Sequence, residues 1–259
     1  MSTACHRVIV PVNFYPPNNR AIAVAEQLAT QFGYDMELAS MLYDPSHTED
    51  RQRLLKKMVR GIKDRLVHTT LTGGTDPAPF ILDLINTADS LVVLAGGTTV
   101  VGIPGSITSD VLRFASHPTV IVGPDVDTHW HGPVKHLLVP LDSSRSAEAA
   151  LSTAAQWATA CGAALDLVQV MGPGDLDGSE YLEQAAASLT CNPRIKITWD
   201  VLHTSLLHRA SAICDRANRQ PGTIICMASH GSRHSQSMIA STTLRVVHHS
   251  AVPVLVTRS

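Results

Sequence analysis

Hydrophobic and polar positions alternate with two periods along this chain, and the same order of periods occurs in both halves. In the C-terminal half, short apolar runs predict five β-strands, at 136–141, 165–170, 194–202, 223–228 and 252–257. Apolar residues at helical spacing predict helices between them, the first ending before Gly162 and the others covering 179–190, 205–218 and 241–250. The N-terminal half follows the same order, and its first helix ends before Gly33. Strands that alternate with helices predict a parallel sheet, because each crossover needs a covering helix.

The two halves also share individual residues. The stretch 7–13 (RVIVPVN) matches 136–142 (HLLVPLD) at an offset of 129, which also places Gly33 on Gly162. Near the end of each half the offset is 135 and pairs Pro118 with Pro253. The sequence therefore predicts two homologous domains, 1–124 and 134–259, separated by a Pro/Gly-bounded polar linker. We expect each to be a doubly wound, five-stranded parallel α/β domain of Rossmann-like or flavodoxin-like type.

Composition narrows the class of protein. Hydrophobic residues make up 44% and charged residues 16% of the 259 positions, which provides a core and argues against disorder. The balance of 20 basic and 22 acidic residues lacks the basic footprint of a nucleic-acid binder. The longest apolar runs are about six residues, against roughly 20 for a membrane span. Five cysteines without a CxxC pair, and an N-terminus without a signal-peptide pattern, favour the cytoplasm.

Polar residues after the first and fourth strands are the candidate site. Ligands of such sheets bind at the carboxyl ends of strands, where the winding reverses. Asp142 follows the first strand of the C-terminal half, and a Ser-rich loop leads from the fourth strand to a helix N-terminus that can bind phosphate. Asp142 would accept hydrogen bonds from a ribose or a base, and Val170 would form an apolar wall. Alternatively, Asp142, Ser143 and Ser144 only cap a helix, and the local pattern leaves both interpretations open.

The combination of these segments resembles a known family. They are Val139-Pro140-Leu141-Asp142, the Ala-rich helix before Gly162, the Met-x-Ser-His-Gly loop at 227–231, and the tail 240–256. Each half resembles a universal stress protein domain, and the whole chain resembles the tandem members of that family. The resemblance implies an adenine nucleotide alpha hydrolase-like fold and a cytoplasmic stress-response protein that binds ATP or a related nucleotide, chiefly in the second domain. The implied nucleotide-binding residues are Pro140, Asp142, Val170, Met227, Ala228, His230, Gly231, Arg233, Ala240, Ser241 and Thr242.

The phosphate loop departs from the family's ATP-binding pattern of Gly, two residues, Gly, nine residues, and Gly-Ser or Gly-Thr. Here the pattern reads Ala228, Gly231 and Ala240-Ser241, with eight residues in the second interval. A Cβ at a position that requires positive φ costs about 1 kcal/mol and can stand where a phosphate oxygen should lie. The substitutions argue against tight ATP binding, although the helix start and Arg233 would still hold an anion.

The first domain is more altered, because an asparagine replaces the aspartate and its fourth-strand loop is shorter, glycine-rich and without His-Gly. Its second-tier site comprises Pro11, Asn13, Met41, Gly96, Gly97, Gly105 and Ser106.

The sequence favours binding over catalysis. It contains no P-loop, no G-x-S-x-G nucleophile elbow, and neither an SGGxDS loop nor a HIGH signature. We expect at most very slow ATP hydrolysis. A helix N-terminus offsets only about half a charge, so bound ATP should bring Mg²⁺ or Mn²⁺. The thirteen histidines have no zinc-site spacing, and we expect no metal site in the protein itself.

The resemblance also implies that the two domains pair through their fifth strands, 118–122 beside 253–257, which would protect two apolar edges. Dimerisation of the whole chain is left open. The competing functional hypothesis is a nucleotide-free module that kept the fold and serves protein interaction or regulation.

Overall fold

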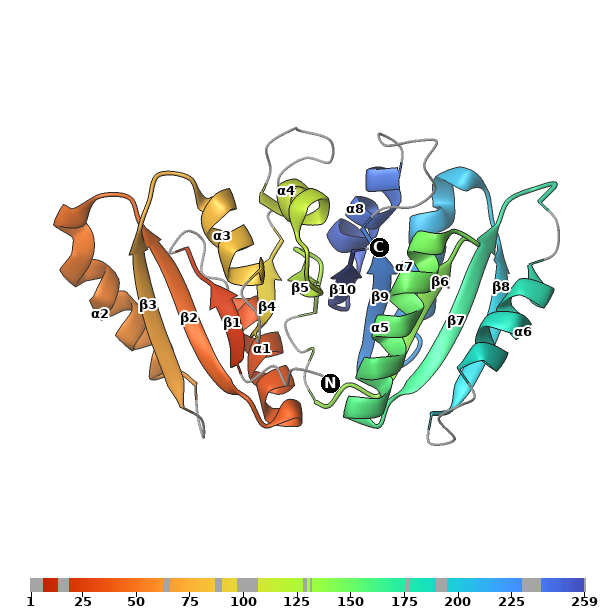
Figure 1. Ribbon diagram of the computed structural model, residues 1–259, viewed down its shortest axis with the longest axis horizontal. Coiled ribbons are helices and arrows are strands. Elements are labelled where there is room, and N and C mark those ends of the chain that lie inside the picture. The colour runs from red at the N-terminus through yellow and green to blue at the C-terminus, as the bar shows by residue number, and fades with distance from the viewer. Residues whose placement is uncertain are drawn as a thin grey trace.

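The computed structural model describes residues 7–13, 19–62, 66–86, 90–96, 107–127, 130, 132–175, 178–189, 195–229 and 239–258. Within these ranges, ten strands form one sheet, accompanied by eight α-helices and two 3₁₀ turns (Figure 1). None of the helices in the described ranges combines the length and apolarity that crossing a membrane requires.

Each half contains five strands in alternation with helices. The N-terminal half consists of β1 (Arg7–Pro11), α1 (Asn19–Phe32), β2 (Asp35–Leu42), η1 (Pro45–His47), α2 (Thr48–Val59), β3 (Val67–Gly73), α3 (Pro77–Asn86), β4 (Ser90–Ala95), α4 (Ile107–Phe114) and β5 (Thr119–Val122). The C-terminal half consists of β6 (His136–Leu141), α5 (Arg145–Cys161), β7 (Ala164–Met171), α6 (Ser179–Ser188), β8 (Ile197–His203), η2 (Leu206–His208), α7 (Arg209–Ala217), β9 (Thr223–Ala228), α8 (Ile239–His249) and β10 (Val254–Thr257).

The strand order is palindromic: β3-β2-β1-β4-β5-β10-β9-β6-β7-β8. All neighbours are parallel except the central pair, in which β10 runs antiparallel to β5 with Leu255 opposite Val120. The expected pairing of the halves through their last strands is therefore confirmed, as is the doubly wound, Rossmann-like fold of each half. Figure 1 shows the two halves on either side of this pair, with β3 and β8 at the outer flanks.

The internal repeat is visible in the coordinates. β2 and β7 have the same length and begin 129 positions apart, at Asp35 and Ala164, whereas β5 and β10 begin 135 apart. Gly33 and Gly162, which follow the first helix of each half, both have left-handed backbones with φ of 71° and 64°. Only glycine adopts this conformation without a steric cost, which explains why both helices end there. The limits 1–124 and 134–259 remain a prediction.

The first helix of the C-terminal half forms where its sequence predicts. Ser144 is its N-cap and accepts a hydrogen bond from the Ala147 nitrogen at 3.2 Å. The buried face of α5 consists mainly of alanine, which lets the helix approach the sheet closely. Its buried residues are Ala147, Ala150, Leu151, Ala154 and Ala158.

Several boundaries differ from the prediction, and β8 for example begins at Ile197 instead of at 194. The predicted helix at 205–218 divides into the turn η2 and the shorter helix α7. β10 begins at Val254 rather than at 252, because Pro253 has no N–H to donate to a ladder. α8 begins at Ile239, two residues before the serine that the prediction used as its start. Isoleucine and alanine are compatible with a helix, so the serine alone was a poor marker of the boundary.

The segment between the halves is polar in composition, but Val126, Trp130 and Val134 are buried in the core. Gln31 of α1 fixes this segment: its Oε1 accepts from the Val134 nitrogen at 2.7 Å, and its Nε2 donates to the Val134 oxygen at 3.0 Å. Phe32 meets Trp157 of α5 edge to face, with ring centroids 5.3 Å apart. The described part of the linker is thus packed against both halves.

Candidate functional site

The winding of the C-terminal half reverses at β6. This strand lies between β7 and β9, and its ladder with β7 runs over its whole length, from His136 to Leu141. Its ladder with β9 covers only the first three residues of each strand and ends at Leu138 opposite Ile225. The ladder between β1 and β4 also stops early, at Ile9. The central strands therefore part at their carboxyl ends, which we call the switch point of each half.

A proline in each central strand provides a reason for this parting. In the N-terminal half, the Val12 nitrogen donates to the Ala39 oxygen of β2 at 2.8 Å. Successive residues of a parallel strand face opposite neighbours, so Pro11 faces β4 with a nitrogen that carries no hydrogen. Pro140 occupies the same place in β6. Each proline removes a donor from the ladder on the side where the switch point opens.

Asp142 lies exposed at the end of β6. Its Oδ1 accepts a hydrogen bond from the Ser144 nitrogen at 3.1 Å, and Ser144 in turn caps α5. The capping interpretation is therefore correct for Ser144, and Asp142 contributes to the same turn. An exposed carboxylate has room to accept further hydrogen bonds, because each oxygen has two acceptor positions.

Gln169 was not identified by the sequence, and Ser143 was named only as a candidate helix cap. Ser143 has a φ of 62°, the one positive value among the described residues other than glycine. Its Oγ accepts from Gln169 Nε2 at 3.1 Å, while Oε1 of this glutamine has no hydrogen-bond partner within the described chain. A left-handed serine stores on the order of 1 kcal/mol, and such strain often accompanies a functional site. The sequence has two adjacent serines after the strand, and it does not indicate which of them adopts the left-handed conformation.

The end of β9 is connected to the next helix. Ala228 lies opposite Thr257 in the ladder with β10, and its carbonyl accepts from Thr243 Oγ1 of α8 at 3.1 Å. Met227 is buried beside it, and Thr242 is half-buried in the first turns of α8. The start of α8 is thus fixed next to the carboxyl end of β9.

Two expectations about the phosphate loop are wrong. Ala228 belongs to a strand and Ala240 to the first turn of α8, so neither has the positive φ expected at the family's glycine positions. The backbone cost of alanine there does not arise, because both residues are part of regular structure. Ser241 is the third residue of α8 and not its first, as the prediction had it.

The structure brings part of the predicted site together. Pro140, Asp142, Val170, Met227 and Ala228 lie at the carboxyl ends of β6, β7 and β9, and Ala240, Ser241 and Thr242 lie in the first turn of α8. His230, Gly231 and Arg233 lie outside the described residues, as do Gly97, Gly105 and Ser106 of the second-tier site. In that site Pro11 and Met41 are buried, Asn13 is exposed, and the Gly96 nitrogen donates to the Val122 oxygen at 2.8 Å.

The local electrostatics are negative. The pKa of Tyr181 in α6 is raised by burial first, and then by the negative charges of Glu148 and Asp142.

Burial also raises the pKa of the Cys226 thiol, which lies in the strand that the sequence predicts at 223–228. Over the described ranges, no three His, Cys, Asp or Glu side chains gather as a metal site would need.

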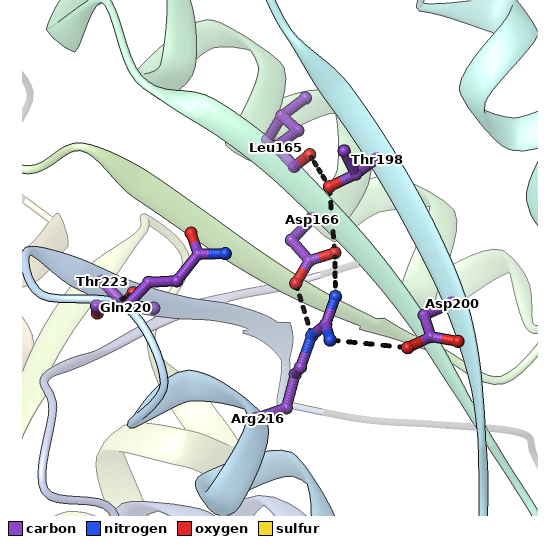
Figure 2. Close-up of polar contacts among 7 residues, drawn as sticks. All are labelled: Leu165, Asp166, Thr198, Asp200, Arg216, Gln220 and Thr223. Atoms are coloured by element: carbon purple, nitrogen blue, oxygen red, sulfur yellow. Dashed lines mark hydrogen bonds and ion pairs between the residues drawn. The ribbon is translucent and has the colours of Figure 1, made fainter.

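A second polar cluster lies away from the switch point. Asp166 of β7 accepts from Arg216 Nε of α7 at 2.7 Å and from Nη2 at 3.1 Å, as Figure 2 shows. At the equivalent position of β2, Glu37 accepts from Arg7 Nη1 at 2.7 Å. Neither ion pair was predicted from the sequence, although Glu37 and Asp166 occupy the same position of the repeat, which indicates a shared role for the two carboxylates. These pairs connect elements of the fold.

Comparison with known proteins shows what the chain is similar to. Residues 200–258 match the universal stress protein family. The fold is similar to that of a universal stress protein from Archaeoglobus fulgidus DSM 4304, with 19% identity, a TM-score of 0.72 and 98% of each chain covered. It is also similar to a protein from Pseudomonas aeruginosa UCBPP-PA14 named as a universal stress protein, with 14% identity, a TM-score of 0.61, and 99% of this chain and 94% of that chain covered. No curated protein matched the sequence.

Proposed function

We propose that this chain, whose residues 200–258 belong to the universal stress protein family and which has the fold of a full-length member, binds an adenine nucleotide at the C-terminal switch point. The observation that carries the proposal is the parting of β6 and β9 beside the exposed carboxylate of Asp142. The proposal includes a stress-response role in the cytoplasm, for which the family match is the support.

Each element of the switch point has a chemical role in this proposal. Asp142 accepts hydrogen bonds from ribose hydroxyls or from the adenine amino group, and Val170 provides an apolar wall for the base. The first turn of α8 presents unpaired N–H groups and a positive dipole end to the phosphates. Because that dipole amounts to about half a charge, ATP would bind with Mg²⁺ or Mn²⁺, and AMP would depend less on the metal.

Binding without efficient turnover is part of the proposal. The described residues at the switch point include one carboxylate, Asp142, and it is already engaged in the turn before α5. Hydrolysis needs a base positioned to activate water, and a carboxylate that is held in a turn is a poor candidate for that role. We therefore expect any ATP hydrolysis to be very slow.

Calorimetric titration with ATP, ADP, AMP and cyclic AMP, each with and without Mg²⁺, tests the proposal. Asp142→Asn keeps an oxygen that can accept from Ser144 but removes the charge, whereas Asp142→Ala removes both. We expect Asp142→Ala and Ser241→Arg to weaken nucleotide binding at least tenfold, and Asp142→Asn to weaken it less. The matched control is Asn13→Ala, at the equivalent place of the N-terminal half.

Heat signals that are absent with all four nucleotides would refute the proposal and favour the nucleotide-free interaction module. Equal losses in Asn13→Ala and Asp142→Ala would place binding in both halves and contradict the assignment to the second. A turnover at ordinary enzyme rates that disappears in Asp142→Ala would contradict the proposed lack of catalysis.

A further inference from the structure

A groove of about 760 Å³ lies between α5 and α6. The two helices cover the same face of the sheet, with β7 between them (Figure 1). Apolar side chains from both helices and the loop after α6 line the groove, namely Leu151, Ala155, Ala185, Leu189 and Ile195. A volume in this range is typical of sites for small organic molecules.

One end of the groove is negative. Glu148 and Tyr181 lie in the first turns of α5 and α6, which begin at the same end of the sheet because both helices run back along parallel strands. Among the described residues that line the groove, Glu148 is the one charged residue, and none is a lysine, arginine or histidine. Burial, and after it the charges of Glu148 and Asp142, raise the pKa of Tyr181 and keep its hydroxyl neutral.

The Tyr181 hydroxyl lacks a hydrogen-bond partner. Its oxygen is buried, and none of the described residues donates to it or accepts from it. A buried polar atom without a partner costs free energy that a ligand can recover. Gln169, which is only 7% exposed, adds a second such atom: its Oε1 has no partner in the described ranges and lies against Gly178, the N-cap of α6.

We propose that this groove binds a small amphipathic molecule that carries a protonated amine. Its apolar ring or chain packs over the alanine and leucine side chains between the helices. Its amine faces the Glu148 carboxylate at the rim, and it donates to the Tyr181 hydroxyl oxygen once the side chain shifts to open this buried atom to the groove. A carboxylic acid of the same size would place a negative charge beside Glu148 and is rejected. This site is separate from the proposed nucleotide site, although Asp142 contributes to the potential of both.

The test uses 2-phenylethylamine and 3-phenylpropionate, a cation and an anion with similar bodies. Methyl NMR of the full chain follows Leu151, Leu189 and Ile195, which line the groove. We expect the amine to shift the methyl signals of these three residues saturably in the millimolar range, and the acid to leave them unchanged. The measurement needs no variant, and repeating it with saturating Mg-ATP should give the same result.

Three variants sharpen the test. Tyr181→Phe removes the buried hydroxyl and should weaken amine binding about tenfold. Glu148→Gln removes an exposed charge and should weaken it about two- to fivefold. Glu183→Gln is the matched control, because Glu183 is exposed in α6 but does not line the groove.

Groove methyl groups that do not respond to the amine overturn the proposal. So do equal shifts with the acid, or an amine affinity that Tyr181→Phe leaves unchanged. Because none of these outcomes depends on ATP, failure here would leave the nucleotide proposal intact, and the reverse also holds.

Discussion

Arg216→Met should destabilise the protein by about 3 kcal/mol at pH 8, because it leaves a buried carboxylate without its cation. Asp166 is 8% exposed and accepts two hydrogen bonds from Arg216 and one, at 3.1 Å, from Thr198 Oγ1 (Figure 2). The substitution removes the two charge-assisted bonds and keeps the neutral one. Each charge-assisted bond contributes about 1.5–3 kcal/mol, and water that enters beside the partly exposed arginine site offsets some of the loss.

The destabilisation should shrink as the pH falls. His136 lies near Asp166, and its pKa is lowered by burial but raised in part by that carboxylate. Without the guanidinium, a proton on His136 compensates part of the buried charge. The folded variant then binds more protons than the folded wild type at mildly acidic pH. By linkage, its stability deficit is largest above the histidine range and decreases below it.

Urea unfolding followed by circular dichroism at pH 8 and pH 5.5 measures both effects. The matched control is Arg7→Met, since Arg7 holds the equivalent Glu37 but its side chain is 45% exposed, and we expect a loss of about 1 kcal/mol. Asp166→Leu combined with Arg216→Met removes both charges and should recover most of the loss. A deficit below about 1 kcal/mol in Arg216→Met, or one that grows on acidification, would refute the reasoning.

Three further predictions concern packing and protonation. In Gly123→Ala, the new Cβ would lie 1.8 Å from the Val247 oxygen, so β5 or α8 must shift, and we expect a loss of about 3 kcal/mol in urea unfolding. Gln31→Ala leaves the buried backbone between the halves without its side-chain partners and should cost about 2 kcal/mol in the same assay. Burial lowers the pKa values of His136 and His248 in the folded protein below the ordinary histidine value of 6.5. At a pH below 6.5 the unfolded chain therefore binds more protons than the folded protein. The contribution of these two histidines to stability should therefore be constant above pH 7 and fall as the pH drops below 6.5, which melting temperatures measured between pH 7 and pH 5.5 would show.

Each of these has a control or a contrary outcome. Gly33→Ala introduces a Cβ that meets no atom within 4 Å but has a φ of 71°, so it should cost only about 1 kcal/mol. Thr30→Ala, on an exposed position next to Gln31, should change stability by less than about 0.5 kcal/mol. A melting temperature that rises between pH 7 and pH 5.5 would contradict the assignment of neutral, buried histidines.

The sequence predicted the fold well where several patterns agreed. β9 occupies the predicted range 223–228, and α5 begins after the Ser144 cap and ends before the left-handed Gly162. Apolar period, cap and glycine all indicate the same element there. The pairing of β5 with β10 was implied by the resemblance to tandem universal stress proteins, and the need to protect two apolar edges supported it.

The sequence was less informative at the site. It placed Asp142 correctly at the end of β6, but it did not predict that Ser143 turns left-handed or that Gln169 reaches across to it. Both depend on tertiary contacts between segments 26 residues apart. The glycine argument at Ala228 was wrong because a motif position was assigned a backbone conformation that the strand does not have. Similarly, the spacing of residues within one segment does not indicate that Arg216 of α7 binds Asp166 of β7.

The antiparallel contact between β5 and β10 joins two copies of one architecture within a single polypeptide. In an assembly of identical chains, each substitution would be installed twice and would have to suit both places. Here it is installed once, so the copies can diverge separately. The two buried carboxylates differ in this way. Glu37 pairs with Arg7 of the neighbouring strand, whereas Asp166 pairs with Arg216 of a helix, and His136 stands at the position that corresponds to Arg7.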